Sequence, residues 1–196
     1  MSTALANVYL IRHGETAWAI SGQHTGRTDI PLTEQGEHDA QALSPRLKGM
    51  SFGQVLTSPL QRARRTAELA GFGDCAQPDP DLMEWNYGAY EGRRTAEIRA
   101  ERPAWRLFND GCPGGETLRA VSLRADGVIA RIRALGSDVL VFAHRDILRI
   151  LAARWLSLPA VGGRHFYLTT TSLSILGYDH DPDEPVIRLW NDARHP

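Results

Sequence analysis

Residues 8–16 read VYLIRHGET, and this stretch decides the fold of the chain. Four apolar, β-prone residues give way to Arg12, His13 and Gly14. The order predicts a buried strand whose carboxyl end presents a cation, an imidazole and a flexible turn. Ligands bind at the carboxyl ends of strands in open α/β sheets, so we expect a binding site here. An imidazole beside a fixed positive charge suits attack on a phosphoryl group whose oxygens the guanidinium holds.

Size, charge and cysteine content narrow the class of protein. The 196 residues favour one domain over residues 1–196, and 42% hydrophobic with 23% charged residues is typical of soluble globular chains. The net charge of −1 gives no global field of the kind that marks nucleic-acid or membrane-surface proteins, so we expect neither partner. Cys75 and Cys112 form no CxxC pair, and we expect no metal site, no disulfide framework and a reducing, cytoplasmic compartment. Met1 to Ala6 do not resemble a signal peptide. The oligomeric state stays open, with a homodimer as one option.

Apolar periodicity predicts strands that alternate with helices. Strands are expected at residues 8–11, 55–57, 138–143, 172–178 and 186–190, with a short strand or extended segment from Asp79 to Met83. Helices are expected from Thr33 to Lys48, directly after Ser58, and over residues 94–101, 104–109, 118–135 and 147–156, with a polar loop at residues 21–26. This alternation predicts a three-layer α/β fold in which helices flank a central, mostly parallel β-sheet.

Two helix starts carry capping signals. Thr33 is a residue of N-cap type that stands directly before a helical pattern. Ser58 is followed by Pro59 and, three residues after the cap, by Gln61, which predicts a sharp helix start. Arg62 then falls in the first turn, where its side chain and the free backbone N–H groups are suited to hold an anion.

Three predicted strand ends carry groups of one chemical kind. The first strand leads to Arg12 and His13, the second leads to the turn that carries Arg62, and the strand at 138–143 leads to His144. Each residue alone could be structural, for instance His144 as a hydrogen-bonded core histidine. If these strands are neighbours in a parallel sheet, the four side chains converge on one crevice that binds a dianion and offers an imidazole as nucleophile.

The chain resembles the histidine phosphatase superfamily (branch 1), also called phosphoglycerate-mutase-like. The resemblance covers nearly the whole chain and rests on the motifs LIRHGET (residues 10–16), TGRTDIPLT (25–33), TSPLQRA (57–63), EWNYGAYEG (84–92), GGET (114–117) and FAH (142–144). It implies an α/β fold with a mainly parallel central sheet. Residues 21–26 and 142–149 look most like the sedoheptulose-bisphosphatase-like and acid-phosphatase-like members.

The resemblance also implies catalytic roles. His13 matches the histidine that becomes phosphorylated, and Arg12, Arg62 and His144 match the other members of the phosphate pocket. Glu84 matches the acid that protonates the leaving oxygen. A carboxyl group suits that task only if burial or neighbouring negative charge keeps it protonated near neutral pH. The alternative for Glu84 is an ordinary salt bridge.

The substrate-binding positions match the family only in part. Thr25 and Gly26 match positions that contact the substrate in mutases. Many members have Asn where this chain has Ala19, and that Asn contacts the phosphoryl group. Its loss removes one hydrogen-bond donor, which Ser21, Gln23 or Thr25 could replace.

A second departure follows the second histidine. Many members have Gly at this position, where the chain has Arg145. This guanidinium could crowd the pocket, bind a second phosphate or carboxylate, or point to solvent. Arg93 and Arg94 are further candidates for recognising a second anionic group.

These features together predict a phosphomonoester hydrolase that works through a phosphohistidine on a small phosphorylated substrate of the sugar phosphate or bisphosphate class. No metal and no other cofactor is expected, because cationic side chains supply the positive charge. The first alternative is a cofactor-dependent phosphoglycerate mutase. Family mutases carry an extra water-excluding segment where this chain has a short stretch between Gly92 and Gly114, which favours hydrolysis. The second alternative is a non-catalytic phospholigand-binding protein, which the retained catalytic positions make the weaker hypothesis.

Overall fold

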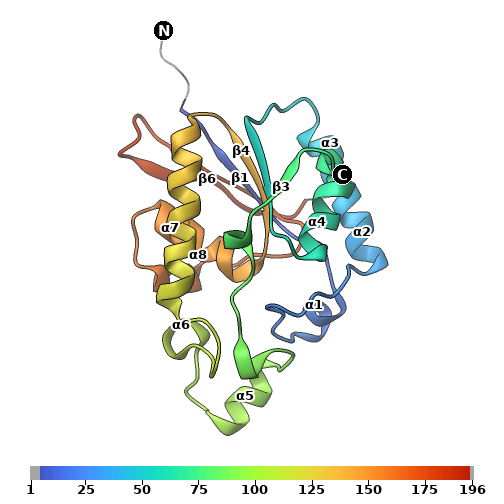
Figure 1. Cartoon of the computed structure of the whole chain (residues 1–196), viewed down its shortest axis with the longest axis vertical. Helices are drawn as coiled ribbons and strands as arrows, with labels where there is room; N and C mark the ends of the chain where they lie inside the picture. The colour runs from blue at the N-terminus through green and yellow to red at the C-terminus, as the bar shows by residue number, and fades with distance from the viewer. Residues whose placement is uncertain (1–4, 195–196) are drawn as a thin grey trace.

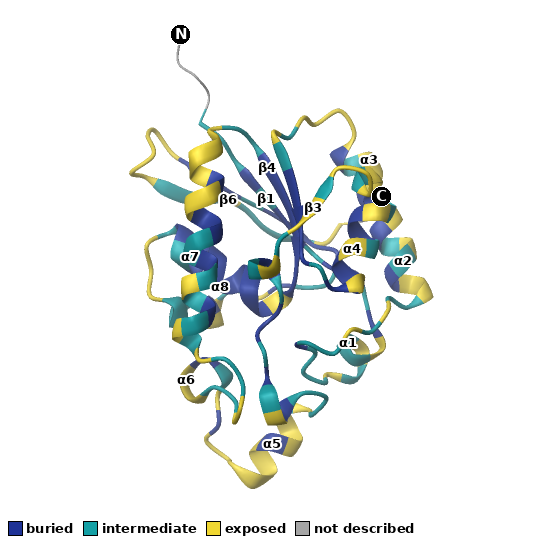
Figure 2. Cartoon of the chain, viewed as in Figure 1, coloured by how far each residue is buried: buried dark blue, intermediate teal, exposed yellow. Residues whose placement is uncertain are grey.

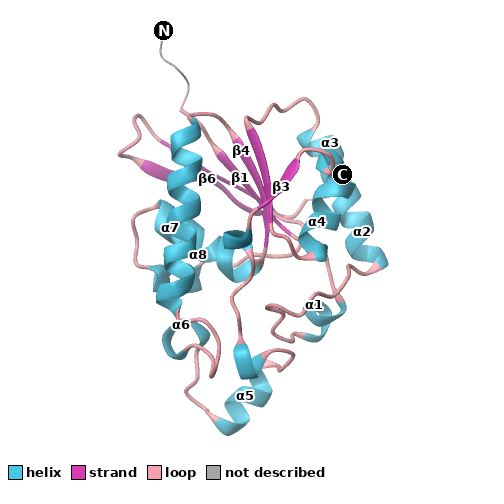
Figure 3. Ribbon diagram, in the orientation of Figure 1, coloured by secondary structure: helices cyan, strands magenta, loops and turns pink. Residues whose placement is uncertain are grey.

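The computed structural model describes residues 5–194 and contains a six-stranded sheet between two layers of helices (Figure 1; Figure 3). The strand order is β3-β2-β4-β1-β5-β6. The first four strands in this order are parallel, β5 is antiparallel to β1, and β6 is antiparallel to β5. The bounds are β1 Val8–Arg12, β2 Gln54–Thr57, β3 Ala76–Pro78, β4 Val139–Ala143, β5 Leu173–Tyr178 and β6 Pro185–Asp192. The predicted three-layer α/β fold with a mostly parallel sheet is confirmed.

Side chains of the central strands alternate between two hydrophobic cores. Val139 and Val141 of β4 pack into the core under α7 and α8, whereas Leu140 and Phe142 pack into the core under α3 and α4. Every residue of β4 is therefore buried (Figure 2). The helices of the first layer are α7 (Leu118–Leu135) and α8 (Arg145–Trp155), and those of the second are α2 (Glu34–Gln41), α3 (Leu43–Leu47) and α4 (Gln61–Ala67).

Three short helices lie beyond the carboxyl ends of β1 and β4 (Figure 1). They are α1 (Ala17–Ser21), α5 (Thr95–Glu101) and α6 (Leu107–Asp110). Further single turns form at Glu68–Phe72, Pro80–Leu82, Gly88–Tyr90 and Ala160–His165. Within residues 5–194, no helix has the length and apolar character needed to cross a membrane.

The segment that begins at Thr33 is only partly as predicted. The cap is confirmed, because Thr33 Oγ1 accepts a hydrogen bond from the backbone N of Gly36 at 3.0 Å. The single helix expected as far as Lys48 is wrong, since α2 and α3 form two separate helices. Pro45 stands inside the predicted helix, where it has no N–H to give the carbonyl of Gln41 and its ring crowds that carbonyl.

The helix start predicted at Ser58 is also wrong, because α4 begins at Gln61 with Leu60 in the cap position. The N–H of Ser58 donates to the carbonyl of Phe142 at 2.9 Å, so Ser58, directly after the end of β2, still pairs with β4 and does not start the helix. Arg62 nevertheless lies in the first turn of α4, as expected.

The strand or extended segment expected from Asp79 to Met83 is wrong as well. The edge strand β3 comes earlier and ends at Pro78. Pro80–Leu82 is a single helical turn whose cap is Asp79, since the Asp79 carboxylate accepts the N–H of Asp81 at 2.9 Å. Proline at a first helical position and Asp at the cap together favour a turn over a strand.

The turn after β1 requires a glycine. A Cβ on Gly14 would lie 2.5 Å from the backbone oxygen of Gly36, so β1 and α2 approach closely at this point. We expect Gly14→Ala to destabilise the fold by about 1–3 kcal/mol, because backbone rather than a flexible side chain must move. Urea unfolding measures the change.

The control for this experiment is Gly162→Ala. The Cβ added there meets its nearest neighbour, Leu158 Cβ, at 3.8 Å. That is ordinary contact, and we expect a change within about 0.5 kcal/mol. Equal unfolding midpoints for the two variants would contradict the close-approach argument.

Candidate active site

A cavity of about 100 Å³, here called the small pocket, opens at the carboxyl ends of β1 and β4. It brings together the predicted residues Arg12, His13 and Glu84 from two distant segments of the chain. The remaining lining residues are Thr16, Trp18, Ala19, Gly22, Gln23, His24, Thr25, Tyr87, Thr95, Arg145 and Asp146. Pockets that enclose a whole ligand measure roughly 300–1,000 Å³, so the small pocket suits one chemical group rather than an entire metabolite.

His13 is buried and presents one ring nitrogen to the small pocket. Its Nδ1 lies 2.7 Å from the carbonyl oxygen of Gly14, which can only accept, so Nδ1 carries the proton. Burial, followed by the positive charges of Arg62 and Arg12, lowers the pKa of His13 well below its usual range. His13 is therefore neutral with its lone pair at Nε2, which is the state required of a nucleophile.

Arg12 has an unused donor. Its Nη1 donates to the carbonyl of Leu168 at 2.7 Å, whereas its Nε is buried and has no hydrogen-bond partner. Burial and the charge of Arg145 lower the pKa of Arg12 to about 10, so the side chain remains a cation at neutral pH. A buried N–H of a charged group is costly without an acceptor, and an anion in the small pocket would supply one.

Arg62 and His144 lie behind the small pocket and are both fully buried. Arg62 donates its Nε to Nδ1 of His144 at 3.1 Å, and its two Nη atoms donate to the carbonyls of Thr25, Gly26 and Thr28. Four of its five N–H donors are thus in use, which holds the loop at residues 25–28 against α4.

His144 is oriented from both sides. Because arginine can only donate, Nδ1 of His144 accepts, and Nε2 carries the proton that points to Ser58 Oγ at 2.7 Å. Burial and the charge of Arg62 lower the pKa of His144 well below its usual range. The ring of His144 lies 5.1 Å from that of His13, centroid to centroid, so Arg62, His144 and Ser58 form a continuous polar support behind the nucleophile candidate.

Glu84 is buried at the start of α8. Its Oε1 accepts the backbone N–H groups of Trp85 and Ile147, and its Oε2 accepts that of Asp146. Burial, followed by the negative charge of Asp146, raises the pKa of Glu84 to about 7 even though these hydrogen bonds favour the charged form. Glu84 is thus matched to proton transfer near neutral pH, and an ordinary salt bridge is not what its surroundings provide.

Asp146 is the counterpart of Glu84. It accepts hydrogen bonds from the Tyr87 hydroxyl at 2.7 Å and from Arg149 Nη1 at 2.6 Å, and Arg145 Nε lies 4.0 Å away. The positive charges of Arg145 and Arg149 outweigh burial and lower the pKa of Asp146. Two carboxyl groups with opposite shifts therefore share one site, with Asp146 charged and Glu84 able to hold a proton.

This pairing leads to a pH prediction. Glu84 must be protonated to donate, so activity should fall as pH rises through about 7. Asp146→Asn removes the negative charge that helps to raise the pKa of Glu84, and the fall should move to lower pH. The measurement is the pH profile of kcat/KM for a sugar phosphate, which reports formation of the phosphoenzyme, the step in which Glu84 acts as the acid.

The matched control is Asp126→Asn, which breaks a half-exposed ion pair with Arg154 far from the small pocket. Its profile should coincide with that of the unmodified protein. A profile of Asp146→Asn that stays in place or moves to higher pH would contradict the coupling of Glu84 to Asp146.

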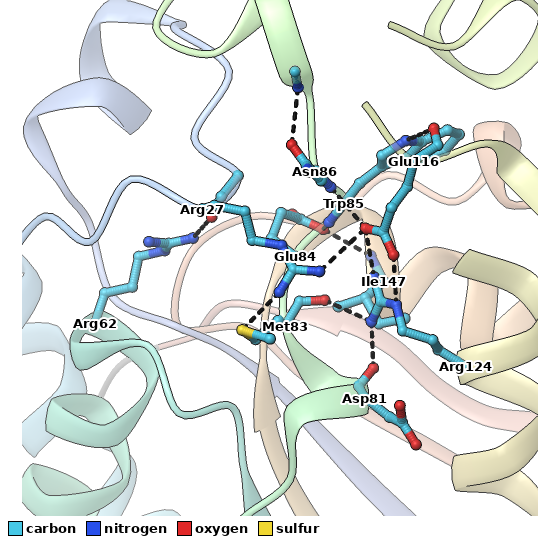
Figure 4. A network of polar contacts seen from close by, with 12 residues as sticks. Arg27, Arg62, Asp81, Met83, Glu84, Trp85, Asn86, Glu116, Arg124 and Ile147 are labelled. Atoms are coloured by element: carbon cyan, nitrogen blue, oxygen red, sulfur yellow. Dashed lines mark hydrogen bonds and ion pairs between the residues drawn. The ribbon is translucent and has the colours of Figure 1, made fainter. Parts of the chain in front are cut away.

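A polar network braces the loop segment that carries Glu84 (Figure 4). Glu116 accepts Arg124 Nε at 2.9 Å, Arg27 Nη2 at 3.3 Å and the backbone N of Asn86 at 2.9 Å. Arg124 also donates to the backbone carbonyls of Asp81 and Met83 (Figure 4). The network fixes the backbone on both sides of Glu84, which keeps the acid in place.

The substrate-binding candidates divide into two groups. The first group lines the small pocket and consists of Arg12, Gln23, Thr25 and Arg145. The second group is buried outside its lining and consists of Gly26, Arg62 and His144. Both ends of the Gln23 amide are occupied, since Nε2 donates to the carbonyl of Gly92 and Oε1 accepts from Ser21.

Arg93 and Arg94 lie outside the cavities at the site. Neither residue lines the small pocket or the larger cavity beside it. Arg93 is paired with Glu101 at 2.6 Å. Neither arginine is therefore placed to recognise a second anionic group.

Comparison with known proteins identifies the family. A family model described as histidine phosphatase superfamily (branch 1) matches residues 8–193. The chain belongs to the histidine phosphatase superfamily. The predicted family membership is thus confirmed, and the match extends over all six strands.

Relatives within the superfamily carry several names. An acid phosphatase of Mycobacterium tuberculosis is 38% identical over 175 residues, which cover 87% of this chain and 86% of the relative. Sedoheptulose 1,7-bisphosphatase of Saccharomyces cerevisiae is 38% identical over 186 residues, covering 76% and 67%. A "Probable phosphoglycerate mutase" of Photorhabdus laumondii is 36% identical, covering 91% and 87%. The solved structure of the alpha-ribazole phosphatase of Shigella flexneri matches with a TM-score of 0.83 at 30% identity, covering 97% and 98%.

Three contacts of this candidate site were not predicted from the sequence: those of Asp146 with Glu84, of Tyr87 with Asp146 and of Ser58 with His144. Asp146 follows Arg145 directly, but nothing local indicates that it faces Glu84. Tyr87 lies in a loop whose aromatic character fits a core equally well. Ser58 was interpreted as a helix cap, and its contact with His144 was therefore not expected.

Proposed function

We propose that the chain is a phosphomonoesterase that transfers the phosphoryl group first to His13 and then to water. The observation that carries the proposal is the state of His13, which is neutral and buried with its lone pair at Nε2 in a pocket that Arg12 also lines. The Nε of Arg12 is buried without a hydrogen-bond partner. The names of the relatives, acid phosphatase and sedoheptulose 1,7-bisphosphatase, support a phosphatase that acts on small phosphorylated compounds.

The first step forms a bond between His13 Nε2 and phosphorus while the bond from phosphorus to the ester oxygen breaks. Arg12 stabilises the charge on the transferring oxygens through its free Nε and Nη2 donors, and Arg62 and His144 support the nucleophile from behind. Glu84 gives its proton to the departing alkoxide. Its pKa of about 7 makes that proton available near neutral pH.

The second step returns the site to its starting state. Water attacks phosphorus, the bond from phosphorus to Nε2 breaks, and Glu84 accepts the proton of the water as a base. Inorganic phosphate then leaves. The proposal includes a metal-independent reaction, because Arg12 and Arg62 supply cationic charge, and a cytoplasmic location, which the free thiols of Cys75 and Cys112 suit.

Hydrolysis is favoured over mutase chemistry by the openness of the site. The small pocket shares His24, Thr95, Arg145 and Asp146 with a neighbouring cavity of about 530 Å³. A mutase must keep water from the phosphohistidine until the phosphoryl group has been returned to a different hydroxyl. A phosphatase instead needs water at this place.

The test is a panel assay of phosphate release from sugar phosphates, sugar bisphosphates, phosphoglycerates and p-nitrophenyl phosphate, with isomerisation of 3-phosphoglycerate measured in parallel. We expect phosphate release from at least one compound and no isomerisation. Isomerisation without phosphate release would replace the proposal by a mutase. Tight phosphate binding with neither reaction would indicate a non-catalytic binding protein.

A further inference from the structure

The cavity of about 530 Å³ that adjoins the small pocket is lined by an unusual concentration of arginine, and we call it the arginine cavity. Five arginines line it, and Asp146 is the only carboxylate among its lining residues. The five are Arg99, Arg106, Arg145, Arg149 and Arg164. A concave surface with this excess of one charge raises the local concentration of ligands of the opposite charge.

We propose that the arginine cavity binds a second acidic group of the substrate, a phosphate or a carboxylate, and that Arg106 and Arg145 select substrates by this group. The inference rests on the proposed phosphatase function and specifies its substrate class. The phosphomonoester occupies the small pocket, and the body of the substrate crosses the shared rim into the arginine cavity.

The volumes of the two cavities support this division. The small pocket, at about 100 Å³, holds little more than the reacting group, whereas the arginine cavity falls in the range of about 300–1,000 Å³ that encloses ligands. His24, Thr95, Arg145 and Asp146 line both cavities, so they mark the passage between them. His24 is held in this passage between the rings of Tyr87 and Trp105, at centroid distances of 4.9 and 5.6 Å.

The hydrogen bonding of the arginines distinguishes structural from available cations. Arg149 has a structural role, because three of its five N–H donors are used by Asp146 and by the carbonyls of Gly163 and Arg164. Arg106, within the described part of the chain, has an exposed side chain with no hydrogen bond or ion pair. Arg145 has only its 4.0 Å contact with Asp146, and its side chain is 49% exposed.

Several arginines elsewhere on the surface are paired with carboxylates. Arg65, Arg131 and Arg154 each pair with a carboxylate within 3 Å. Arg99, Arg106 and Arg164 of the arginine cavity have no such pair among residues 5–194; Arg99 donates to the carbonyl of Trp105 and Arg164 contacts Asn109 and His165. Planar guanidinium groups without a carboxylate partner are the donors best suited to phosphate and carboxylate oxygens.

Asp146 lines both cavities and contacts charged residues of each. Its carboxylate is held by Tyr87 and Arg149, and it lies beside both Arg145 and Glu84. The same carboxylate therefore contacts Arg145 at the passage and, together with burial, raises the pKa of Glu84 in the small pocket. Arg145 thus lies between the small pocket, where the phosphomonoester reacts, and the proposed site for the second anion.

The test compares substrates that differ only in the second acidic group. One pair is 3-phosphoglycerate and glycerol 3-phosphate, which differ by a carboxylate, and the other is fructose 1,6-bisphosphate and fructose 6-phosphate, which differ by a phosphate. We expect kcat/KM to be at least about 10-fold higher for the doubly acidic member of one pair, and which pair shows the effect identifies the group.

The variants Arg106→Met and Arg145→Met keep much of the apolar stem and remove the charge. We expect each to lower the selectivity for the doubly acidic substrate by about 10-fold or more, mainly through a higher KM. The control Arg119→Met removes an exposed arginine of α7 that lies outside the arginine cavity, and its selectivity should equal that of the unmodified protein.

The outcomes separate the two proposals. Hydrolysis of p-nitrophenyl phosphate with equal kcat/KM for both members of each pair would overturn the second-anion site and leave the phosphatase intact. Unchanged selectivity in Arg106→Met and Arg145→Met would also overturn it. No phosphate release from any compound, p-nitrophenyl phosphate included, would overturn the proposed function and with it this inference.

Discussion

His13→Ala is expected to reduce phosphate release by about 10⁴-fold or more, because it removes the atom that forms the bond to phosphorus. The structure also says which of the two buried histidines is the nucleophile. Both nitrogens of His144 are engaged, by Arg62 and by Ser58, and His144 does not line the small pocket. His13 has Nδ1 bound to the Gly14 carbonyl and Nε2 available.

The measurement is trapping of the phosphoenzyme. A phosphohistidine survives alkali and is lost in acid, so an alkaline quench of the unmodified protein with labelled substrate should retain about one label per chain at most, located on His13 by peptide mapping. His13→Ala should retain none. Label on His144 in either protein would contradict the assignment of the nucleophile.

A folding control is needed because His13 is buried. Truncation of a buried side chain leaves a cavity and lowers stability, so inactivity alone would not separate chemistry from unfolding. Thermal unfolding of His13→Ala, together with its binding of inorganic phosphate, establishes whether the Arg12 donors are still in place. Retained phosphate binding with lost turnover is the expected combination.

Most of the fold was predictable because its central strands are short apolar runs that end at polar residues, whereas the edge strand β3 has no such pattern and was missed. In β4, alternate residues pack into two different cores, and both sets must be apolar, so the strand is apolar throughout and easily recognised. The boundaries that failed were decided by longer-range contacts. Ser58 has every local mark of a helix cap, yet its N–H pairs with Phe142 across the sheet and keeps it extended.

The same distinction applies to the candidate site. Arg12 and His13 stand at the end of a strand, so their position follows from local sequence and from the general rule for α/β sheets. The partners of Arg62 are carbonyls of the loop at residues 25–28, which no local pattern reveals. The role of Asp146 could not be predicted, because it depends on Glu84, which lies far away in the sequence and accepts a backbone N–H at the start of α8.

The arginine cavity shows this limit most clearly. Arg93 and Arg94 were candidates for a second anion because they follow the aromatic loop, but Arg93 is paired with Glu101. The residues that do line the cavity include Arg99, Arg106 and Arg164, which come from segments that meet only in three dimensions. Arginines that lie in separate segments of the sequence cannot be recognised as one site until the structure shows which segments lie side by side.

Glu84→Gln is expected to lower phosphate release from sugar phosphates by about 10²–10⁴-fold, the usual contribution of a general acid. The loss should depend on the leaving group. An alkoxide needs the proton that Glu84 supplies, whereas p-nitrophenolate is stable without one, so formation of the phosphoenzyme from p-nitrophenyl phosphate should change little. Removal of the phosphoryl group still requires a base for water, and the phosphoenzyme should therefore accumulate. Rapid-quench measurement should show a burst of p-nitrophenol followed by slow turnover.

This dependence on the leaving group separates proton transfer from a structural role. Glu84 accepts three backbone N–H groups, and the amide nitrogen of Gln would face at least one of them, which costs about 1–3 kcal/mol of stability. A structural defect of that kind would slow both classes of substrate alike and produce no burst. Equal losses for sugar phosphates and p-nitrophenyl phosphate would thus contradict the role of Glu84 as acid and base. A burst that appears only with p-nitrophenyl phosphate would assign both proton transfers to Glu84, whose pKa is raised to about 7 by burial and by Asp146.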